Sequence, residues 1–279
     1  MKQTVKTLEK MKAEGRKISQ LTCYDYTTAS IMDRAGVDMI LVGDSLAMTM
    51  QGYNDTLPIT LDEMIIYGRS VARACKNAFV VVDLPFMSYQ ISKEQALESA
   101  GRIMKEATGV NAVKIEGGVN IAPQIKAITD AGIPVVAHIG MTPQSVNAFG
   151  GFKVQGKGDA NAERVLKDAL AVQEAGAFAV TLECIPPRLA ELITKKLHII
   201  TIGIGAGSKC DGQVLVYQDM LAMGGDFCPK FVKRFANIGQ DMENAFSEYK
   251  KAVSEGTFPE EKHTYTDGDC SDEFIKTHS

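Results

Sequence analysis

Short apolar runs alternate with amphipathic segments along most of this chain, and this alternation restricts its possible folds more than any other feature. Continuous apolar runs are typical of strands in a parallel sheet whose faces are covered by helices. Eight strand–helix units predict a (β/α)8 barrel, also called a TIM barrel, with a doubly wound open sheet as the alternative. The eight runs lie at 17–25, 37–45, 78–85, 111–118, 133–140, 177–184, 198–205 and, more weakly, 213–217.

The segments between these runs carry the signals of helix ends. Thr60 with Glu63, and Ser92 with Gln95, have the spacing of residues that cap helix N-termini. Three of the runs follow an Ala-Gly pair, which is typical of a helix that ends at glycine and leads into a strand. We expect residues 1–259 to form one barrel domain with a short N-terminal helix, and residues 260–279 to form a polar C-terminal tail.

Composition excludes several classes of protein. The formal net charge of -4 provides no basic surface for nucleic acid, and no run of about 18 apolar residues is present to span a membrane. The first 15 residues lack the apolar core of a signal peptide. Six cysteines occur without a CxxC pair, which favours free thiols in a reducing compartment over disulfides or a zinc site. We therefore expect a cytoplasmic enzyme of small-molecule substrates, without nucleic-acid or membrane partners.

Charged side chains gather where the predicted strands end, which is where barrel enzymes place their active sites. Five consecutive strands contribute Asp44, Asp83, Lys114, Glu116, His138 and Glu183. Crowded carboxylates repel one another, and a hard divalent cation relieves this repulsion. Without nearby pairs of cysteines or histidines, Asp44, Asp83 and Glu116 favour Mg2+ over zinc.

The other charged residues suggest the chemistry of the site. Lys114 would balance the residual negative charge of the site or bind an anionic substrate; a role as a Schiff-base nucleophile is disfavoured because the neighbouring acids stabilise its charged form. Glu183 lies apart from the metal-binding trio and is the candidate general base, or it pairs with a cation in the barrel wall. His138 is a further candidate acid–base group, or a neutral histidine packed at a strand end. The pattern predicts a metal-assisted enzyme that forms an enolate from a small keto acid.

A glycine-rich segment, GIGAGS at 203–208, follows the seventh run. Its backbone amides would bind phosphate, or its small residues would let the loop approach a bound substrate. It does not match a dinucleotide-binding fingerprint, which belongs after the first strand.

Several long motifs in order resemble the ketopantoate hydroxymethyltransferase family over about residues 3–260. They are VGDSLAMTMQGYNDTLPITLDEM (42–64), VVDLPFMSYQ (81–90), AVKIEGG (112–118), HIGMTPQSVNAFGGFKVQGK (138–157), LECIPP (182–187), GIGAGSKCDGQVLV (203–216) and KFVKRFANI (230–238). The resemblance implies a (β/α)8 barrel of the phosphoenolpyruvate/pyruvate type, usually assembled as a homodecamer. It also implies transfer of a hydroxymethyl group from 5,10-methylenetetrahydrofolate to 3-methyl-2-oxobutanoate through a Mg-stabilised enolate, giving 2-dehydropantoate.

The same resemblance implies roles for individual residues. Asp44, Asp83 and Glu116 match the magnesium-site carboxylates, some of them acting through water. Ser45 and Lys114, together with Asp44 and Asp83, match the substrate-binding positions. Glu183 matches the proton acceptor. The segment 144–157 is expected to form a lid or a wall for the folate.

Departures from the family pattern are small: Ala47 stands where glycine is expected, and Asn147 where histidine is common. An isocitrate-lyase-like enzyme is the nearest alternative, but the KKCGH-like loop of such lyases is absent. A scaffold that has lost activity would lack one of the acids or the lysine, and all of them are present.

Overall fold

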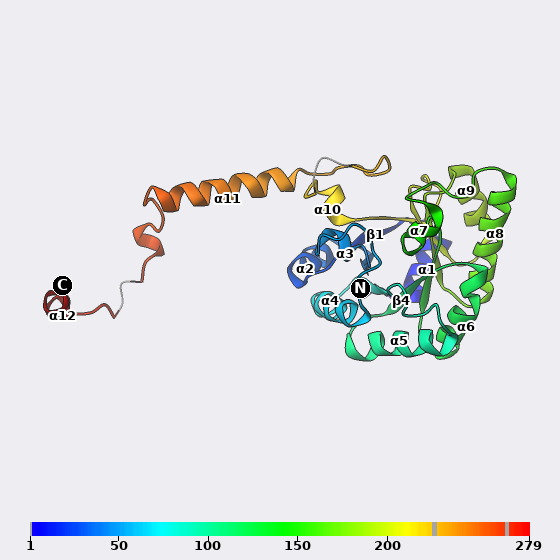
Figure 1. The fold of residues 1–279 in the computed structure, drawn as a ribbon, viewed down its shortest axis with the longest axis horizontal. Helices are drawn as coiled ribbons and strands as arrows, with labels where there is room; N and C mark the ends of the chain where they lie inside the picture. Colours follow the sequence, from blue (N-terminus) through cyan, green and yellow to red (C-terminus); the bar gives the residue numbers. More distant parts are fainter. Residues whose placement is uncertain (1, 225–227, 266–267) are drawn as a thin grey trace.

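The computed structural model describes residues 2–224, 228–265 and 268–279 (Figure 1). Residues 1, 225–227 and 266–267, which fall within the predicted barrel domain and tail, lie outside the described residues. Eight parallel strands form a closed barrel in sequence order, and β1 pairs with both β2 and β8. The strands are β1 (Ile18–Thr22), β2 (Met39–Val42), β3 (Phe79–Asp83), β4 (Ala112–Glu116), β5 (Val135–Gly140), β6 (Ala179–Glu183), β7 (Ile200–Ile204) and β8 (Gly212–Leu215). This closure confirms the predicted barrel, including its weakest strand, and excludes the open sheet.

Helices cover the outside of the barrel, as the amphipathic segments predict. Three of them begin or end as the sequence indicates: Thr60 and Glu63 form a capping box, Ser92 accepts the backbone N–H of Gln95, and Gly176 has a positive φ. The main helices of the barrel are α2 (Tyr26–Arg34), α4 (Leu61–Ala74), α5 (Lys93–Glu106), α6 (Ala122–Asp130), α8 (Asp159–Glu174) and α9 (Pro187–Lys196). Shorter helical segments follow some strands, namely α3 (Leu46–Thr49), η1 (Val119–Ile121), η2 (Pro143–Ser145), α7 (Val146–Phe149) and α10 (Tyr217–Met220).

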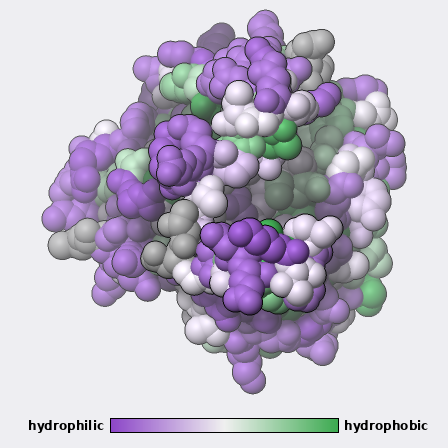
Figure 2. Space-filling view, turned by 90° about the vertical axis from the view of Figure 1, so that its left-hand side faces the viewer, coloured by the Kyte–Doolittle hydropathy of each residue, from purple (hydrophilic) through white to green (hydrophobic). Residues whose placement is uncertain are grey.

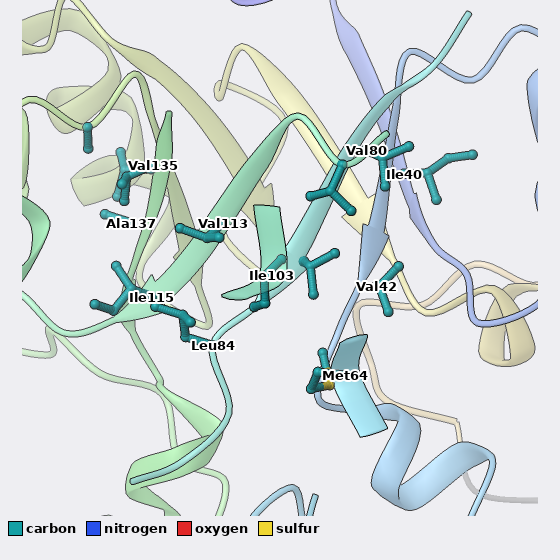
Figure 3. Close-up of a cluster of buried hydrophobic side chains, with 14 of the residues drawn as sticks. Ile40, Val42, Met64, Val80, Leu84, Ile103, Val113, Ile115, Val135 and Ala137 are labelled. Atoms are coloured by element: carbon teal, nitrogen blue, oxygen red, sulfur yellow. The ribbon is translucent and has the colours of Figure 1, made fainter. Parts of the chain in front are cut away.

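Successive residues of each strand point alternately outward and inward, so the apolar side chains form two cores. The outer core lies between the strands and the helices; in Figure 3, Val80 and Val113 from the strands lie in one cluster with Met64 of α4 and Ile103 of α5. The inner core fills the barrel at the end where the strands begin. Its side chains include Met39, Val81, Ala112, Val136, Ala179 and Ile200. The N-terminal helix α1 (Val5–Ala13) closes that end with Leu8 and Met11, which pack into the inner core.

The inward-facing positions change from apolar to charged toward the carboxyl ends of the strands. Val81 and Ala112 are paired in the inner core, and two residues further along the same face Asp83 pairs with Lys114. Between the next two strands, Glu116 of β4 pairs with His138 of β5. Because side chains on one face of a strand are two residues apart, the charged layer lies directly above the apolar side chains of the inner core.

The last long helix, α11 (Ile238–Ser254), projects away from the barrel (Figure 1). None of its residues is buried. Beyond it lie η3 (Glu261–His263) and α12 (Asp272–His278), which are also exposed. Along the described residues, no helix is both long enough and apolar enough to cross a membrane.

Candidate active site

A cavity of about 460 Å³ opens at the carboxyl ends of the strands, and all seven predicted site residues line it. They are Asp44, Ser45, Asp83, Lys114, Glu116, His138 and Glu183. Sequence reasoning therefore identified side chains that the fold brings together, while their individual roles stay predictions.

Lys114 and Asp83 form a buried ion pair at the floor of the cavity. Lys114 Nζ lies 2.6 Å from Asp83 Oδ1, and both side chains are almost fully buried. Burial alone would lower the pKa of Lys114, but the carboxylates of Asp83, Glu116 and Asp44 raise it above its usual range. Lys114 is therefore a fixed positive charge, which disfavours a Schiff-base role because that chemistry needs a neutral amine.

Asp44 lies in the most unfavourable position for a negative charge. Burial raises the pKa of Asp44 well above its usual value, and repulsion from Asp83 and Glu116 raises it further. Lys114 and a hydrogen bond from Gln144 oppose this effect. The crowded carboxylates carry more negative charge than Lys114 balances, and an added cation would stabilise their ionised forms.

His138 lies between two of the acids. Its Nδ1 is 3.2 Å from Glu116 Oε1, and its Nε2 is 3.1 Å from Glu183 Oε2. Burial and the charge of Lys114 lower the pKa of His138, but Glu116 and Glu183 outweigh them and raise it to about 9. A protonated His138 would connect the carboxylate cluster to Glu183, which at 15% is the most exposed of these three side chains.

Gln144 organises the carboxylates, and sequence reasoning missed it. Its backbone N–H donates to Glu116 Oε2 (2.9 Å), and its side-chain amide donates to Asp44 Oδ2 (2.8 Å) and to the carbonyl of Leu84 (2.9 Å). The hydroxyl of Tyr89 donates to Gln144 Oε1 (2.6 Å), which fixes the orientation of the amide. Gln144 lies in η2, on a loop that folds back over the strand ends, so strand periodicity gives no signal for it.

Ser45 has a hydrogen-bond partner that the sequence did not indicate. Its Oγ lies 2.8 Å from the hydroxyl of Tyr24, which follows β1. An added Cβ at Gly43 would come within 2.9 Å of Ser45 Oγ, so glycine there leaves room for the hydroxyl group. Ser45 is therefore held at the edge of the cavity by two neighbouring strand ends.

Oxygen atoms dominate the candidate metal ligands. Among the described residues, no three His, Cys, Asp or Glu side chains are grouped closely enough to enclose a metal by themselves. Glu116 also directs its oxygens toward His138 and the backbone of Gln144. Asp83 is engaged in the same way, because its Oδ1 accepts from Lys114 and its Oδ2 accepts the backbone N–H of Asp44 (3.0 Å). All three predicted metal ligands therefore already accept hydrogen bonds within the site.

The glycine-rich loop and the segment after η2 form other parts of the cavity region. An added Cβ at Gly205, which has a φ of +62°, would lie 3.1 Å from Cys184 Sγ and 3.1 Å from the ring of Phe231. Glycine is therefore required here by the packing of protein side chains, and the predicted approach of this loop to a bound substrate or phosphate stays a prediction. Phe152 and Val154, within the predicted lid segment 144–157, line the cavity.

Comparisons of this sequence with known proteins point to one enzyme family. A family model described as ketopantoate hydroxymethyltransferase matches residues 2–261. A 3-methyl-2-oxobutanoate hydroxymethyltransferase of Clostridium beijerinckii is 57% identical over 265 residues, covering 95% of this chain and 96% of the relative. The enzyme of the same name from Clostridium acetobutylicum is 53% identical over 277 residues, covering 99% of this chain and 100% of the relative.

Solved structures with a similar fold are distant in sequence. A phosphonopyruvate hydrolase complexed with oxalate and Mg++ aligns with a TM-score of 0.60 at 13% identity, covering 99% of this chain and 95% of that chain. A 2,3-dimethylmalate lyase of the PEP mutase/isocitrate lyase superfamily aligns with a TM-score of 0.59 at 15% identity, covering 99% of this chain and 94% of that one. These likenesses support the barrel fold alone.

Proposed function

The chain belongs to the ketopantoate hydroxymethyltransferase family, and we propose that it transfers a hydroxymethyl group from 5,10-methylenetetrahydrofolate to 3-methyl-2-oxobutanoate. The product would be 2-dehydropantoate, an intermediate of pantothenate biosynthesis. The relatives support this activity at more than half identity over nearly their full length. The observation that carries the proposal within the site is the buried Lys114–Asp83 pair in the same cavity as Glu183, because it combines an anion-binding charge with a separate base.

The residues of the site fit Mg2+. They supply hard carboxylate oxygens, and burial with repulsion from Asp83 and Glu116 disfavours the charge of Asp44 when no cation is present. Mg2+ usually binds through one or two carboxylates and keeps water or substrate oxygens, which agrees with the expectation that some of Asp44, Asp83 and Glu116 act through water. When bound, the ion would supply Lewis-acid polarisation of the keto acid.

The chain's own side chains would then perform three tasks. Lys114 and the hydroxyl of Ser45 bind and orient the carboxylate and keto oxygens of the substrate. Glu183 accepts the proton from C3, and the electron pair of the broken C–H bond becomes the enolate that attacks the one-carbon unit. His138, in contact with Glu183, holds that carboxylate in place.

Exchange of the C3 proton of 3-methyl-2-oxobutanoate tests the enolate step without the folate. In D2O, we expect the protein with Mg2+ to remove the C3 proton signal from the NMR spectrum, and the protein without Mg2+ to exchange it far more slowly. No exchange with folded, Mg2+-loaded protein, both alone and with tetrahydrofolate added, would contradict the proposed function.

The remaining expectations concern the organisation of the protein. We propose that residues 1–259 act as one domain with 260–279 as a tail; the family match to residues 2–261 supports this boundary.

We also propose a cytoplasmic homo-oligomer, a decamer by family resemblance. The exposed helix α11 supports assembly, because Met242, Phe246, Tyr249 and Val253 are exposed at helical spacing on one face.

A further inference from the structure

The cavity is larger than a five-carbon keto acid needs, and its two parts differ in chemistry. Its volume of about 460 Å³ is in the range of sites that hold drug-sized molecules. The floor carries the charged residues described above. The rest of the lining is mainly apolar and includes Met48, Phe152, Val154, Val216, Pro229 and Phe231. In the surface view, most side chains are hydrophilic, and hydrophobic ones gather where the surface is hollowed (Figure 2).

Phe231 brings an aromatic ring close to the proposed base. A Cβ added at Gly205 would lie 3.1 Å from both the ring of Phe231 and Cys184 Sγ, so ring and thiol lie close to each other beside this glycine. Cys184 directly follows Glu183 at the end of β6. A flat ligand against Phe231 would therefore lie next to the point where the enolate forms.

Asp219 is an acidic residue in this mainly apolar part of the lining, which also includes the cation Lys153 between Phe152 and Val154. It lies in α10, directly after β8, and its side chain is half-buried. Burial raises the pKa of Asp219, and the positive charge of Arg234 opposes this effect. Among the described residues, no hydrogen bond reaches a carboxylate oxygen of Asp219, so a ligand can donate to this carboxylate alongside the nearby charge of Arg234.

A carboxylate beside an aromatic face suits one kind of ligand. Two neighbouring N–H donors on a flat heterocycle match the two oxygens of a carboxylate, and the ring face matches an aromatic side chain. A phosphate or nucleotide tail is disfavoured at this position because Asp219 would repel it. The pterin ring of a folate has this combination: a 2-amino group beside the N3–H group on a flat bicyclic ring.

We propose that the apolar part of the cavity binds the pterin ring of the one-carbon carrier, with the Asp219 carboxylate accepting hydrogen bonds from its 2-amino and N3–H groups and Phe231 against its face. This inference rests on the proposed function and adds the location of the folate. It places the carrier above the keto acid, with the transferred carbon toward Glu183.

Calorimetry on the full chain with Mg2+ measures the direct binding of tetrahydrofolate and tests the role of Asp219. Asp219→Asn removes the charge while keeping the shape, and we expect it to weaken binding by about 10- to 100-fold, the usual range for a lost charge-assisted contact. Asp272→Asn makes the same change on the exposed helix α12 and serves as the matched control, with unchanged binding expected. Tetrahydrofolate affinity in Asp219→Asn equal to that of the wild type would overturn the proposal.

Two further comparisons keep the test independent of a folding defect. The wild type should prefer 6-methylpterin over 6-methyllumazine, in which an oxo group replaces the 2-amino group, and Asp219→Asn should reduce this preference. Phe231→Leu should weaken binding of tetrahydrofolate, whereas Phe231→Tyr, which keeps the ring, should retain it. An unchanged preference in Asp219→Asn, or equal binding by both Phe231 variants, would contradict the assignment.

The C3-proton exchange of the wild type separates this inference from the proposed function. Exchange by the wild type together with undiminished folate binding in Asp219→Asn would overturn only the folate site. A wild-type protein that neither exchanges the proton nor binds tetrahydrofolate would overturn both.

Discussion

At the scale of single residues, the carboxylates of the site are held by different hydrogen-bond and ion-pair partners. Glu183 contacts His138, whereas Asp44 and Glu116 are held by Gln144. This separation would allow one carboxylate to act as the proposed base while the others hold the proposed cation. Two residues therefore give distinct predictions, one for proton transfer and one for metal affinity.

Replacing Glu183 by Gln should slow removal of the C3 proton by at least about 100-fold, because general bases typically contribute that much. Binding of the keto acid should change little, since Lys114 and Ser45 remain. NMR exchange in D2O measures the first quantity, and calorimetry measures the second. Unchanged exchange would remove Glu183 from the role of base.

Replacing Gln144 by Ala should weaken Mg2+ binding by about 10- to 100-fold, which is typical when a group that orients metal ligands is lost. The physical reason is that Asp44 and Glu116 would both lose their donor or its fixed position. Calorimetric titration with Mg2+ measures the affinity without requiring turnover. Gln90→Ala, which removes a neighbouring amide bonded to Gln144 Oε1, is the control with the smaller expected effect. Equal affinities in the wild type and Gln144→Ala would show that the amide does not position the ligands.

At the scale of elements, some backbone N–H groups in the loops have no backbone acceptor and donate to side chains instead. Asp33, near the end of α2, accepts the backbone N–H groups of Lys76 (3.1 Å), Asn77 (2.8 Å) and Ala78 (2.7 Å) just before β3. Burial alone would raise the pKa of Asp33, but these hydrogen bonds lower it below its usual value. The carboxylate thus fixes where β3 begins, and with it the position of Asp83.

Replacing Asp33 by Ala should lower the free energy of unfolding by about 3 kcal/mol, because three backbone donors lose a charged acceptor. The folded pKa of Asp33 is lower than the unfolded one, so its contribution is present at neutral pH and above. It is lost as the pH falls below about 4 and passes through the folded value. Urea unfolding at a series of pH values should therefore show the largest difference between wild type and variant at neutral pH. A difference independent of pH would exclude the ionised carboxylate as the cause.

Much of the fold and part of the site followed from the sequence because both depend on local periodicity. The alternation within strands predicts that Lys114 and Glu116 share a face, and the parallel order of the strands brings Asp83, His138 and Glu183 to the same end. Gln144 and Tyr89 were not predicted, because they reach the site from loops whose path depends on tertiary contacts. Similarly, Asp219 follows a short strand on which no charged pattern points inward.

At the scale of the whole molecule, α11 is a long helix that a single copy of the chain leaves uncovered. Its stripe of Met242, Phe246, Tyr249 and Val253 is exposed, with Phe246 at 65%. Burying such a stripe against another subunit would stabilise an assembly through the hydrophobic effect.

Replacing Phe246 by Glu should shift the protein to smaller assemblies in sedimentation velocity, because a charge in an apolar contact opposes association. Asn244→Glu introduces the same charge on the same helix but away from the stripe, and we expect it to keep the assembly of the wild type. Identical sedimentation of the three proteins would show that α11 does not hold subunits together.

The closure of the barrel also determines when the protein can fold during its synthesis. Leu21 of β1 pairs with Ile40 of the neighbouring strand and with Leu215 of β8, almost two hundred residues later. Until β8 has left the ribosome, β1 keeps one open edge, and the growing sheet keeps another at its newest strand. Open strand edges are sites where chains associate wrongly, and contacts between distant residues form slowly. The first strand therefore cannot complete its pairing until the last has been synthesised, and the nascent chain keeps open strand edges for most of its translation.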